Sequence, residues 1–375
     1  MNSESIVKIK VIGVGGAGNN TVEKMISKGL DNVKFIVANT DVQQLNNSTV
    51  NHKLTLGIST KGLGAGSNPE VGQLAAIESE RDIQEIIKES DLIIIAAGMG
   101  GGTGTGASPI IANLAKKSGA LVVAIVTTPF SFEGRKRREN AESGIKALEK
   151  EVDSIVVISN DKLLKQFADI SLKDSFNAVD KVLECAIRTI TDLLQQNNLI
   201  NLDFADLSSV VKNKGHAIIG MGKASGEDRA IKAATYAISS PLLETSILGA
   251  QDVIINVAAS DITLAEAEIA VNAIEQASGN QLNILFGVSI QEELADALQV
   301  SVIATGNVNL NNKQDHQQIK NVVSNALEKV DVSLENVKTK EILIDDPFPS
   351  DATHEFSYDG DLPLFLKKDG EEDDD

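Results

Sequence analysis

Short, nearly continuous apolar segments alternate with amphipathic segments through the first half of the chain. Apolar runs of this length predict strands, which we expect at residues 7–12, 33–37, 92–97, 120–126 and 154–158. The amphipathic segments between them predict helices at residues 21–27, 69–89, 108–117 and 139–150. Alternating strands and helices with such apolar strands predict an α/β fold: a Rossmann-like parallel sheet covered on both faces.

A long amphipathic helix is expected over residues 172–195. Its apolar positions recur every three or four residues, which indicates one face packed on a core: Phe176, Val179, Leu183, Ile187, Ile190 and Leu194. Beyond it, the pattern predicts helices at 228–237 and 263–277 and strands at 217–221, 252–258, 283–288 and 300–304. We therefore expect a second, smaller α/β domain after the long helix.

The last part of the chain changes in composition. From Asn307 it is rich in Asn, Gln, Asp and Lys, with one helical stretch expected at 318–329. Such a composition is typical of a disordered tether. The expected organisation is a first domain at 1–171, a connecting helix at 172–200, a second domain at 201–306, a flexible linker at 307–357 and a C-terminal peptide with an acidic tail at 358–375.

Three glycine-rich loops carry the candidate chemistry, at residues 13–18, 62–68 and 98–106. Each follows an expected strand or opens an expected helix, so all three are expected at one edge of a parallel sheet. Glycines there let backbone N–H groups converge on phosphate, and helix N-termini favour its charge. No lysine lies in or just after the third loop, which excludes a P-loop there and predicts that Mg²⁺ balances the phosphate charge.

The first of these loops has an alternative interpretation. Gly13–Gly18 matches G-x-G-x-x-G, and Asp41 ends the next expected strand. This combination alone favours an NAD-binding oxidoreductase, and a lone match can also be a tight packing turn. Three converging loops suit a triphosphate better than a dinucleotide. The structural alternative for 98–106, a flexible linker, fits poorly because apolar elements flank it on both sides.

Composition narrows the class of partner. The chain has 34 Lys+Arg against 53 Asp+Glu, a net charge of −19, and only 3% aromatic residues. These values oppose nucleic-acid binding. One cysteine, Cys185, fits a reducing cytoplasm, and the four histidines lack the spacing of metal ligands. The N-terminal segment does not read as a signal peptide, and no apolar run approaches ~18 residues, so we expect a cytoplasmic protein with no membrane insertion.

The third loop also carries a resemblance. Residues 101–106, Gly-Gly-Thr-Gly-Thr-Gly, resemble the signature of the tubulin/FtsZ superfamily of GTPases. The match to the bacterial cell-division branch of that family covers about residues 6–306 almost without gaps. It also rests on four further motifs, at residues 12–20, 39–41, 64–69 and 129–135, and on Asn201–Asp206.

The resemblance implies a GTP/GDP site with Mg²⁺, and K⁺ as a further candidate cation. Asn160, Phe176 and Asp180 would surround guanine, and Glu133 and Arg137 would lie at the ribose. Asp180 would accept from the base N1–H and amino group, which adenine cannot supply. The remaining nucleotide-binding positions are Gly15, Gly16, Ala17, Gly18, Asn19, Asn39, Ala65, Gly66, Gly98, Gly101, Gly102, Thr103, Gly104 and Thr105.

Taken alone, some of these residues have simpler interpretations. The run Arg135–Arg138 reads as a solvated basic surface. Phe176 and Asp180, four apart on a helix, read as a core aromatic and a surface acid.

The catalytic candidates are Asn201, Asp203 and Asp206. Two acids three apart share one face of a helical turn, and beside a triphosphate they suit polarisation of a water. The simpler interpretation is an N-cap of the next helix, formed by Asn201 or Asp203. The resemblance implies that this loop acts on the nucleotide of a neighbouring subunit in a longitudinal homopolymer, so that polymerisation activates hydrolysis.

A short apolar motif near the end of the chain resembles the peptide with which the family docks on membrane-tethering division proteins. Its candidate residues are Asp361, Leu362, Pro363, Phe365 and Leu366. The sequence therefore predicts a self-assembling GTPase of the bacterial division ring at mid-cell. The alternatives are a related GTPase for plasmid partition or cell shape, a non-enzymatic nucleotide-binding scaffold, and the NAD enzyme.

Overall fold

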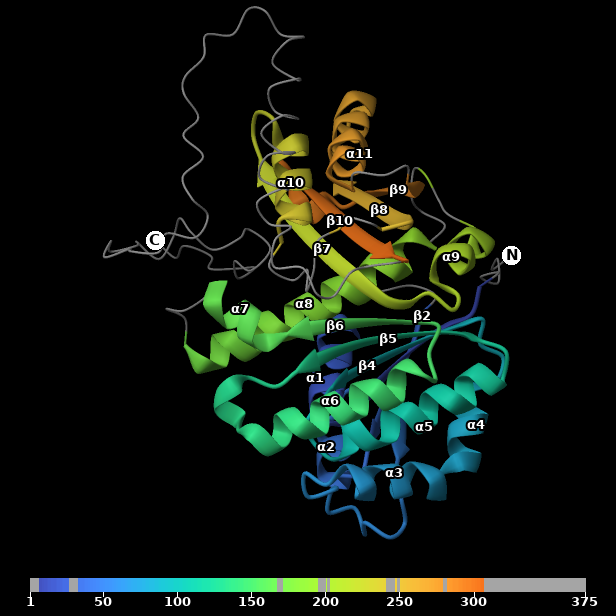
Figure 1. The fold of residues 1–375 in the computed structure, drawn as a ribbon. Helices are drawn as coiled ribbons and strands as arrows, with labels where there is room; N and C mark the ends of the chain where they lie inside the picture. The colour runs from blue at the N-terminus through green and yellow to red at the C-terminus, as the bar shows by residue number, and fades with distance from the viewer. Residues whose placement is uncertain are drawn as a thin grey trace, which may run out of the picture.

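The computed structural model describes residues 7–26, 33–166, 171–194, 200, 203–240, 247, 250–278 and 282–306. Its strands form one hydrogen-bonded sheet of order β3-β2-β1-β4-β5-β6-β7-β10-β8-β9 (Figure 1). From β3 to β7 neighbouring strands are parallel. The order 3-2-1-4-5-6 places the ends of β1 and β4, whose connections leave in opposite directions, side by side.

The bounds of the strands are β1 (Ile9–Val14), β2 (Val33–Asn39), β3 (His52–Thr55), β4 (Leu92–Gly98), β5 (Leu121–Thr128), β6 (Ser154–Ser159), β7 (Gly215–Ser225), β8 (Asp252–Ala259), β9 (Asn283–Ile290) and β10 (Ala297–Thr305). The α-helices are α1 (Gly15–Ile26), α2 (Val42–Asn47), α3 (Pro69–Glu78), α4 (Glu80–Ile87), α5 (Thr103–Lys117), α6 (Arg135–Glu149), α7 (Asn160–Gln166), α8 (Leu172–Leu193), α9 (Phe204–Val211), α10 (Arg229–Ile238) and α11 (Leu264–Ser278). Two short 3₁₀ turns, η1 (Ser131–Glu133) and η2 (Glu292–Leu294), complete the described elements.

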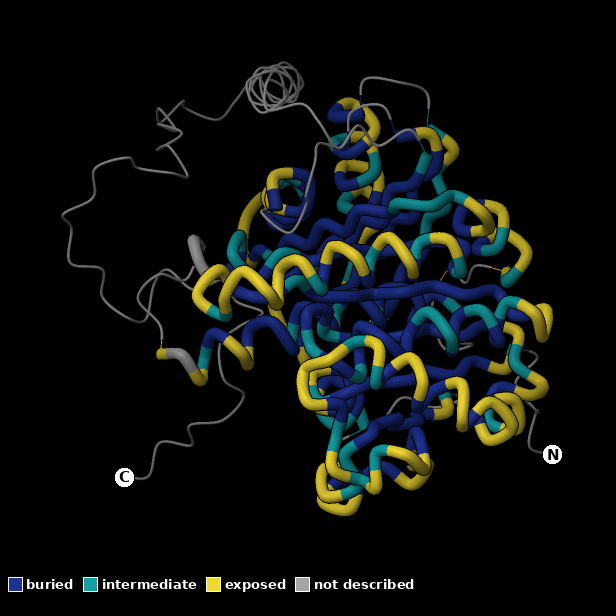
Figure 2. Tube along the Cα trace, turned by 60° about the horizontal axis from the view of Figure 1, so that its bottom comes forward, coloured by how far each residue is buried: buried dark blue, intermediate teal, exposed yellow. Residues whose placement is uncertain are grey.

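Both faces of the parallel part of the sheet are covered. Along β4, Ile94 packs in the core beneath α1 and α8, while its neighbours Ile93 and Ile95 pack beneath α3, α4, α5 and α6. Side chains that alternate between two cores account for the unbroken apolar strand. Figure 2 shows the result, with buried strands inside and exposed residues on the outer helix surfaces.

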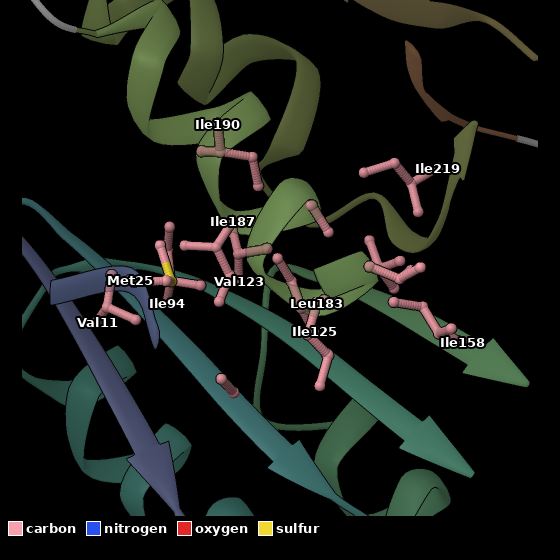
Figure 3. Packing of buried hydrophobic residues seen from close by; sticks show 14 of the residues in the cluster. Val11, Met25, Ile94, Val123, Ile125, Ile158, Leu183, Ile187, Ile190 and Ile219 are labelled. Carbon is pink, nitrogen blue, oxygen red and sulfur yellow. The ribbon is translucent and has the colours of Figure 1, made fainter. Parts of the chain in front are cut away.

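Helix α8 connects the two parts of the sheet. Leu183, Ile187 and Ile190 are buried on its inner face. They share one core with Val123 of β5 and Ile219 of β7 (Figure 3). The expected apolar stripe is therefore confirmed along most of the helix. Phe176 departs from it, because it is 43% exposed near the start of the helix.

The second part of the sheet is mixed. β10 lies between β7 and β8 and is antiparallel to both, whereas β8 and β9 are parallel. Ile219 of β7 faces the α8 core, and Ile218 faces a separate core beneath α10 and α11. In the smaller α/β unit predicted after the long helix, both faces of the sheet are thus also covered by helices.

Several helix boundaries differ from the sequence prediction. Helix α1 begins at Gly15 rather than at residue 21, and α5 begins at Thr103 rather than at residue 108. Glycine is a poor helix former, so propensity predicts loops there. The fold needs glycine because a Cβ on Gly18 would lie 2.2 Å from the Ala96 carbonyl oxygen. Because glycine permits close packing on the sheet, both helices begin within the glycine motifs, earlier than propensity predicts.

The helix expected over 69–89 is two helices. Ser79 separates them with a non-helical ψ of 17°, and its hydroxyl oxygen accepts from the Gly57 N–H at 2.8 Å. The expected N-cap is confirmed: Asn68 accepts from the Glu70 N–H, and Pro69 is the first helical residue. The predicted linker, the helix at 318–329 and the C-terminal peptide lie outside the described residues.

Candidate nucleotide site

The carboxyl ends of the central parallel strands lie level with one another. Val14 of β1 is opposite Ala97 of β4, Gly98 is opposite Thr127 of β5, and Thr128 is opposite Ser159 of β6. The segments that follow these strands therefore meet at one edge, as the sequence predicts. They contain most of the predicted nucleotide-binding residues.

Two glycine motifs touch one another at this edge. Gly15 has a φ of +72°, and a Cβ on it would lie 2.9 Å from the Gly104 backbone nitrogen. A Cβ on Gly104 would lie 2.6 Å from the Gly98 carbonyl oxygen. The N-termini of α1 and α5 are thus packed backbone to backbone. Gly102, the N-cap of α5, offers no side-chain cap, so first-turn N–H groups remain for an anion.

The third glycine motif closes the other side of the cradle. A Cβ on Gly102 would lie 2.6 Å from Ala65 Cβ, and a Cβ on Gly98 would lie 2.7 Å from Ala17 Cβ. By contrast, a Cβ on Gly101 would meet nothing within 4 Å. Gly98 and Gly102 are thus tightly packed, whereas the space next to Gly101 is open. This arrangement forms a backbone cradle with room for a ligand.

Both threonines of the α5 motif are engaged in the loop. The Gly100 N–H donates to Thr105 Oγ1 at 2.8 Å, and Thr105 is buried. The Thr103 and Thr40 hydroxyls lie 2.7 Å apart. Thr105 therefore holds the loop in shape, and Thr103 links it to the end of β2.

Two predicted asparagines brace the base of the cradle. Asn39 and Asn19 are both buried. The Asn39 Nδ2 donates to Gln44 at 2.8 Å and to the Asn19 side-chain oxygen at 3.1 Å. In that amide orientation, Asn19 donates to the Gly13 and Gly15 carbonyl oxygens. These side chains position the first glycine motif.

Beyond β5, Glu133 and Arg137 form an ion pair. Glu133 also accepts from the Phe130 N–H at 2.9 Å, which fixes the turn η1. Arg137 lies in the first turn of α6, which begins at Arg135 rather than at residue 139. A neighbouring groove of about 940 Å³ includes both residues among its walls but neither Gly15 nor Asp180. It adjoins the cradle on the side of α3 and α6.

The predicted base-binding residues lie on α7 and α8. Asn160 is buried at the start of α7, and its Oδ1 has no hydrogen-bond partner within the described part of the chain. An orphaned buried acceptor fits a ligand donor such as a guanine amine. The exposed ring of Phe176 packs edge to face on the ring of Phe130, with 5.3 Å between the ring centroids.

Asp180 is buried and has a partner that the sequence did not reveal. Its Oδ2 lies 2.7 Å from the Lys24 ammonium of α1. Burial raises the pKa of Asp180 above its ordinary value, and the bond to Lys24 opposes that rise. Lys24 is 156 residues away in sequence. Only the packing of α1 on α8 brings the two together, so no local pattern could have identified the pair.

The catalytic candidates lie at the other end of the molecule. Asp203 is the N-cap of α9 without a side-chain cap bond, and Asp206 lies in the first turn. Both are exposed, and Asn201 lies outside the described residues. In Figure 1, α7 lies near one end of α8 and α9 lies beyond the other end. Since α8 has 22 residues, it separates the two ends by ~33 Å. One copy of the chain therefore does not bring the acids to the cradle.

Two negative findings apply to the described residues alone. They contain no group of three or more His, Cys, Asp or Glu side chains that could hold a metal ion. None of their helices combines the length and apolarity needed to span a bilayer.

Comparisons with known proteins agree with this geometry. The model of the "Tubulin/FtsZ family, GTPase domain" matches residues 8–168, and that of the "FtsZ family, C-terminal domain" matches 215–308. A relative from Mycoplasmopsis pulmonis (strain UAB CTIP), described as "Cell division protein FtsZ", is 51% identical over 376 residues, covering 96% of each chain.

Solved structures give the same result. An empty FtsZ dimer from M. jannaschii has a TM-score of 0.77 and 40% identity, covering 81% of this chain and 89% of that one. CetZ2 from Haloferax volcanii, a GTPgS-bound protofilament, has a TM-score of 0.68 and 20% identity, covering 88% of this chain and all of that one. At that identity the CetZ2 likeness concerns the fold alone.

Proposed function

This chain belongs to the tubulin/FtsZ family, and on that premise we propose that it is a GTP-hydrolysing filament protein of the bacterial division ring. The observation that carries the proposal is the contact between the N-termini of α1 and α5 at Gly15 and Gly104. Two helix N-termini and their backbone N–H groups suit the phosphates of a nucleotide. Such a ring would act in the cytoplasm at mid-cell, the division site.

The nucleotide would extend from the cradle toward α8. Its phosphates would lie against Gly15–Gly18 and Gly98–Thr105, with Ala65 and Gly66 closing the far side. Glu133 and Arg137 would contact the ribose. Asn160 and Asp180 would accept the donors of guanine, and the exposed Phe176 ring would lie against the base.

A metal ion would be held mainly by the phosphates. The cradle offers N–H and hydroxyl donors, and the described residues provide no cluster of metal ligands. A bound Mg²⁺ would supply positive charge that neutralises the charge developing during phosphoryl transfer. K⁺ is a further cation to test in the same assays.

Hydrolysis would be completed by a neighbouring subunit. Asp203 and Asp206 are exposed at the end of the molecule opposite the cradle. Longitudinal stacking would deliver them, with Asn201, to the γ-phosphate of the next subunit, where they would polarise the attacking water. Catalysis would then be positioning and charge stabilisation, as in other phosphoryl transfers.

The C-terminal peptide would connect the filament to the membrane. Asp361, Leu362, Pro363, Phe365 and Leu366 form a short apolar motif flanked by charge. A short apolar segment of this kind suits a groove on a membrane-tethering division protein.

Assembly-coupled hydrolysis predicts a threshold in protein concentration. The GTPase rate of the full chain, measured with Mg²⁺ against protein concentration, is expected to rise sharply at one concentration. Sedimentation in GTP should show pellets from the same concentration, and sedimentation in GDP should show fewer. A rate strictly proportional to protein from the lowest concentration would contradict hydrolysis in trans.

A further inference from the structure

Lys24 on α1 connects two polar residues of α8. Its ammonium donates to Asp180 Oδ2 at 2.7 Å and to Asn177 Oδ1 at 3.0 Å. The Asp180 side chain is 13% exposed and that of Lys24 is 37% exposed. A partly buried cation thus fixes one oxygen of a buried carboxylate, while the carboxylate's second oxygen, Oδ1, lies outside the ion pair.

The protonation state of Asp180 decides what it can recognise. An ionised carboxyl group only accepts hydrogen bonds, which matches the N1–H and amino donors of guanine. A protonated carboxyl group also donates, so that it loses this match. Burial favours the protonated form of a carboxylic acid, and a cation within contact favours the ionised form.

We propose that Lys24 is a positioning residue for base recognition, which keeps Asp180 ionised and orients its carboxylate toward guanine. The inference rests on the proposed function, because it assumes that Asp180 reads the base. It adds a residue of α1 to a selectivity that the family resemblance assigns to α7 and α8 alone.

Within the described part of the chain, two charged groups act on Asp180. Lys24 from α1 is the cation whose field stabilises the carboxylate, and Glu184, one turn along α8, acts in the opposite direction. Glu184 is itself buried. Without Lys24, burial and Glu184 would both favour protonation of Asp180, and the effect would grow as the pH falls.

Binding of GDP and ADP to the full chain tests the inference. We expect Lys24→Met to weaken GDP binding about tenfold at pH 6 and less at pH 8, and Lys24→Arg to restore it. ADP binding should not fall in parallel, because adenine does not use the carboxylate. Lys8→Met is the matched control, since Lys8 forms an ion pair with Glu89 far from the cradle. It should leave GDP affinity unchanged at both pH values.

Other outcomes would overturn the inference. GDP affinity of Lys24→Met equal to wild type means that Lys24 does not act on Asp180, and a higher affinity means that Lys24 competes with the base. A loss that is equal at both pH values and persists in Lys24→Arg indicates a structural role alone. A separate variant, Asp180→Ala, tests the premise: unchanged preference for GDP over ADP there refutes the proposed base site itself.

Discussion

At Gly104 the distance between two backbone segments excludes a side chain. A Cβ there would lie 2.6 Å from the Gly98 carbonyl oxygen and 3.3 Å from that of Val14. Both neighbours belong to strands and cannot move without disturbing the sheet. Gly101, three residues earlier, has open space around the same position. Glycine therefore has two roles within one loop. Gly104 allows close backbone packing, and Gly101 leaves space open.

This contrast predicts different effects for two alanine substitutions. Gly104→Ala should lower the free energy of unfolding by about 1–3 kcal/mol, the usual cost of overpacking, and weaken GTP binding by displacing α5. Gly101→Ala should leave the unfolding free energy unchanged but weaken GTP binding, because its methyl group would occupy space for the ligand. Urea unfolding and nucleotide titration measure both. Normal GTP affinity of Gly101→Ala would place the ligand elsewhere.

The elements show how far the sequence could be interpreted. Apolar runs located nine of the ten described strands within a few residues, because a strand buried on both faces is apolar along most of its length. The sequence prediction missed the short edge strand β3, in which only Leu54 is buried. The helix starts at Gly15 and Thr103 were missed because glycine disfavours helix in local propensity. Only the close packing of these helices on the sheet explains why glycine-rich segments are helical here. The pair Lys24–Asp180 was missed for a related reason: it depends on where α1 lies against α8. What is local in the chain could be predicted, and what depends on tertiary contact could not.

At the joint between α10 and α11, one arginine connects three segments. Arg229 donates to Glu266 Oε1 at 2.6 Å and to the main-chain oxygens of Asp261 and Asp296 at 2.9 Å. Hydrogen bonds from Arg229 lower the pKa of Glu266 from its ordinary value of 4.5 to about 2. The cluster therefore connects the start of α10 to α11, to the segment after β8 and to the segment before β10.

The lowered pKa of Glu266 predicts how the joint responds to acid. The unfolded state takes up the proton first, so the stabilisation is complete above pH ~4.5 and is lost as the pH falls toward 2. Glu266→Gln should lower the unfolding free energy at pH 7 by about 1–3 kcal/mol, with a smaller difference at pH 3. Urea unfolding at both pH values measures this. Glu268→Gln, an exposed acid on the same helix, is the control. A pH-independent difference would show that the ion pair is not responsible.

The whole molecule has two chemically different ends. Backbone N–H groups and the predicted base-binding residues lie near the carboxyl edge of the parallel strands, and two exposed acids lie beyond the far end of α8. The sequence indicated the glycine loops and the two acids because each is a compact motif, whereas the base-binding residues were predicted from the family resemblance. Their separation follows from the ~33 Å length of a rigid helix. Under the proposed function, a single copy would present half of a hydrolytic site at each end, so catalysis would require a second copy.

The strongest test of this arrangement follows one subunit's nucleotide. Asp203→Ala should bind GTP normally, because its cradle is intact, and should hydrolyse it at least about a hundredfold more slowly. Asp203→Ala chains loaded with γ-labelled GTP should then release labelled phosphate when wild-type chains are added, since the wild-type acids would reach the label. Excess unlabelled GTP prevents released label from rebinding to the wild type. Addition of more Asp203→Ala chains is the control and should release none. Rapid hydrolysis by Asp203→Ala alone would mean that Asp203 is not needed for catalysis. No release with wild type would mean that the wild-type acids do not act on a neighbour's nucleotide.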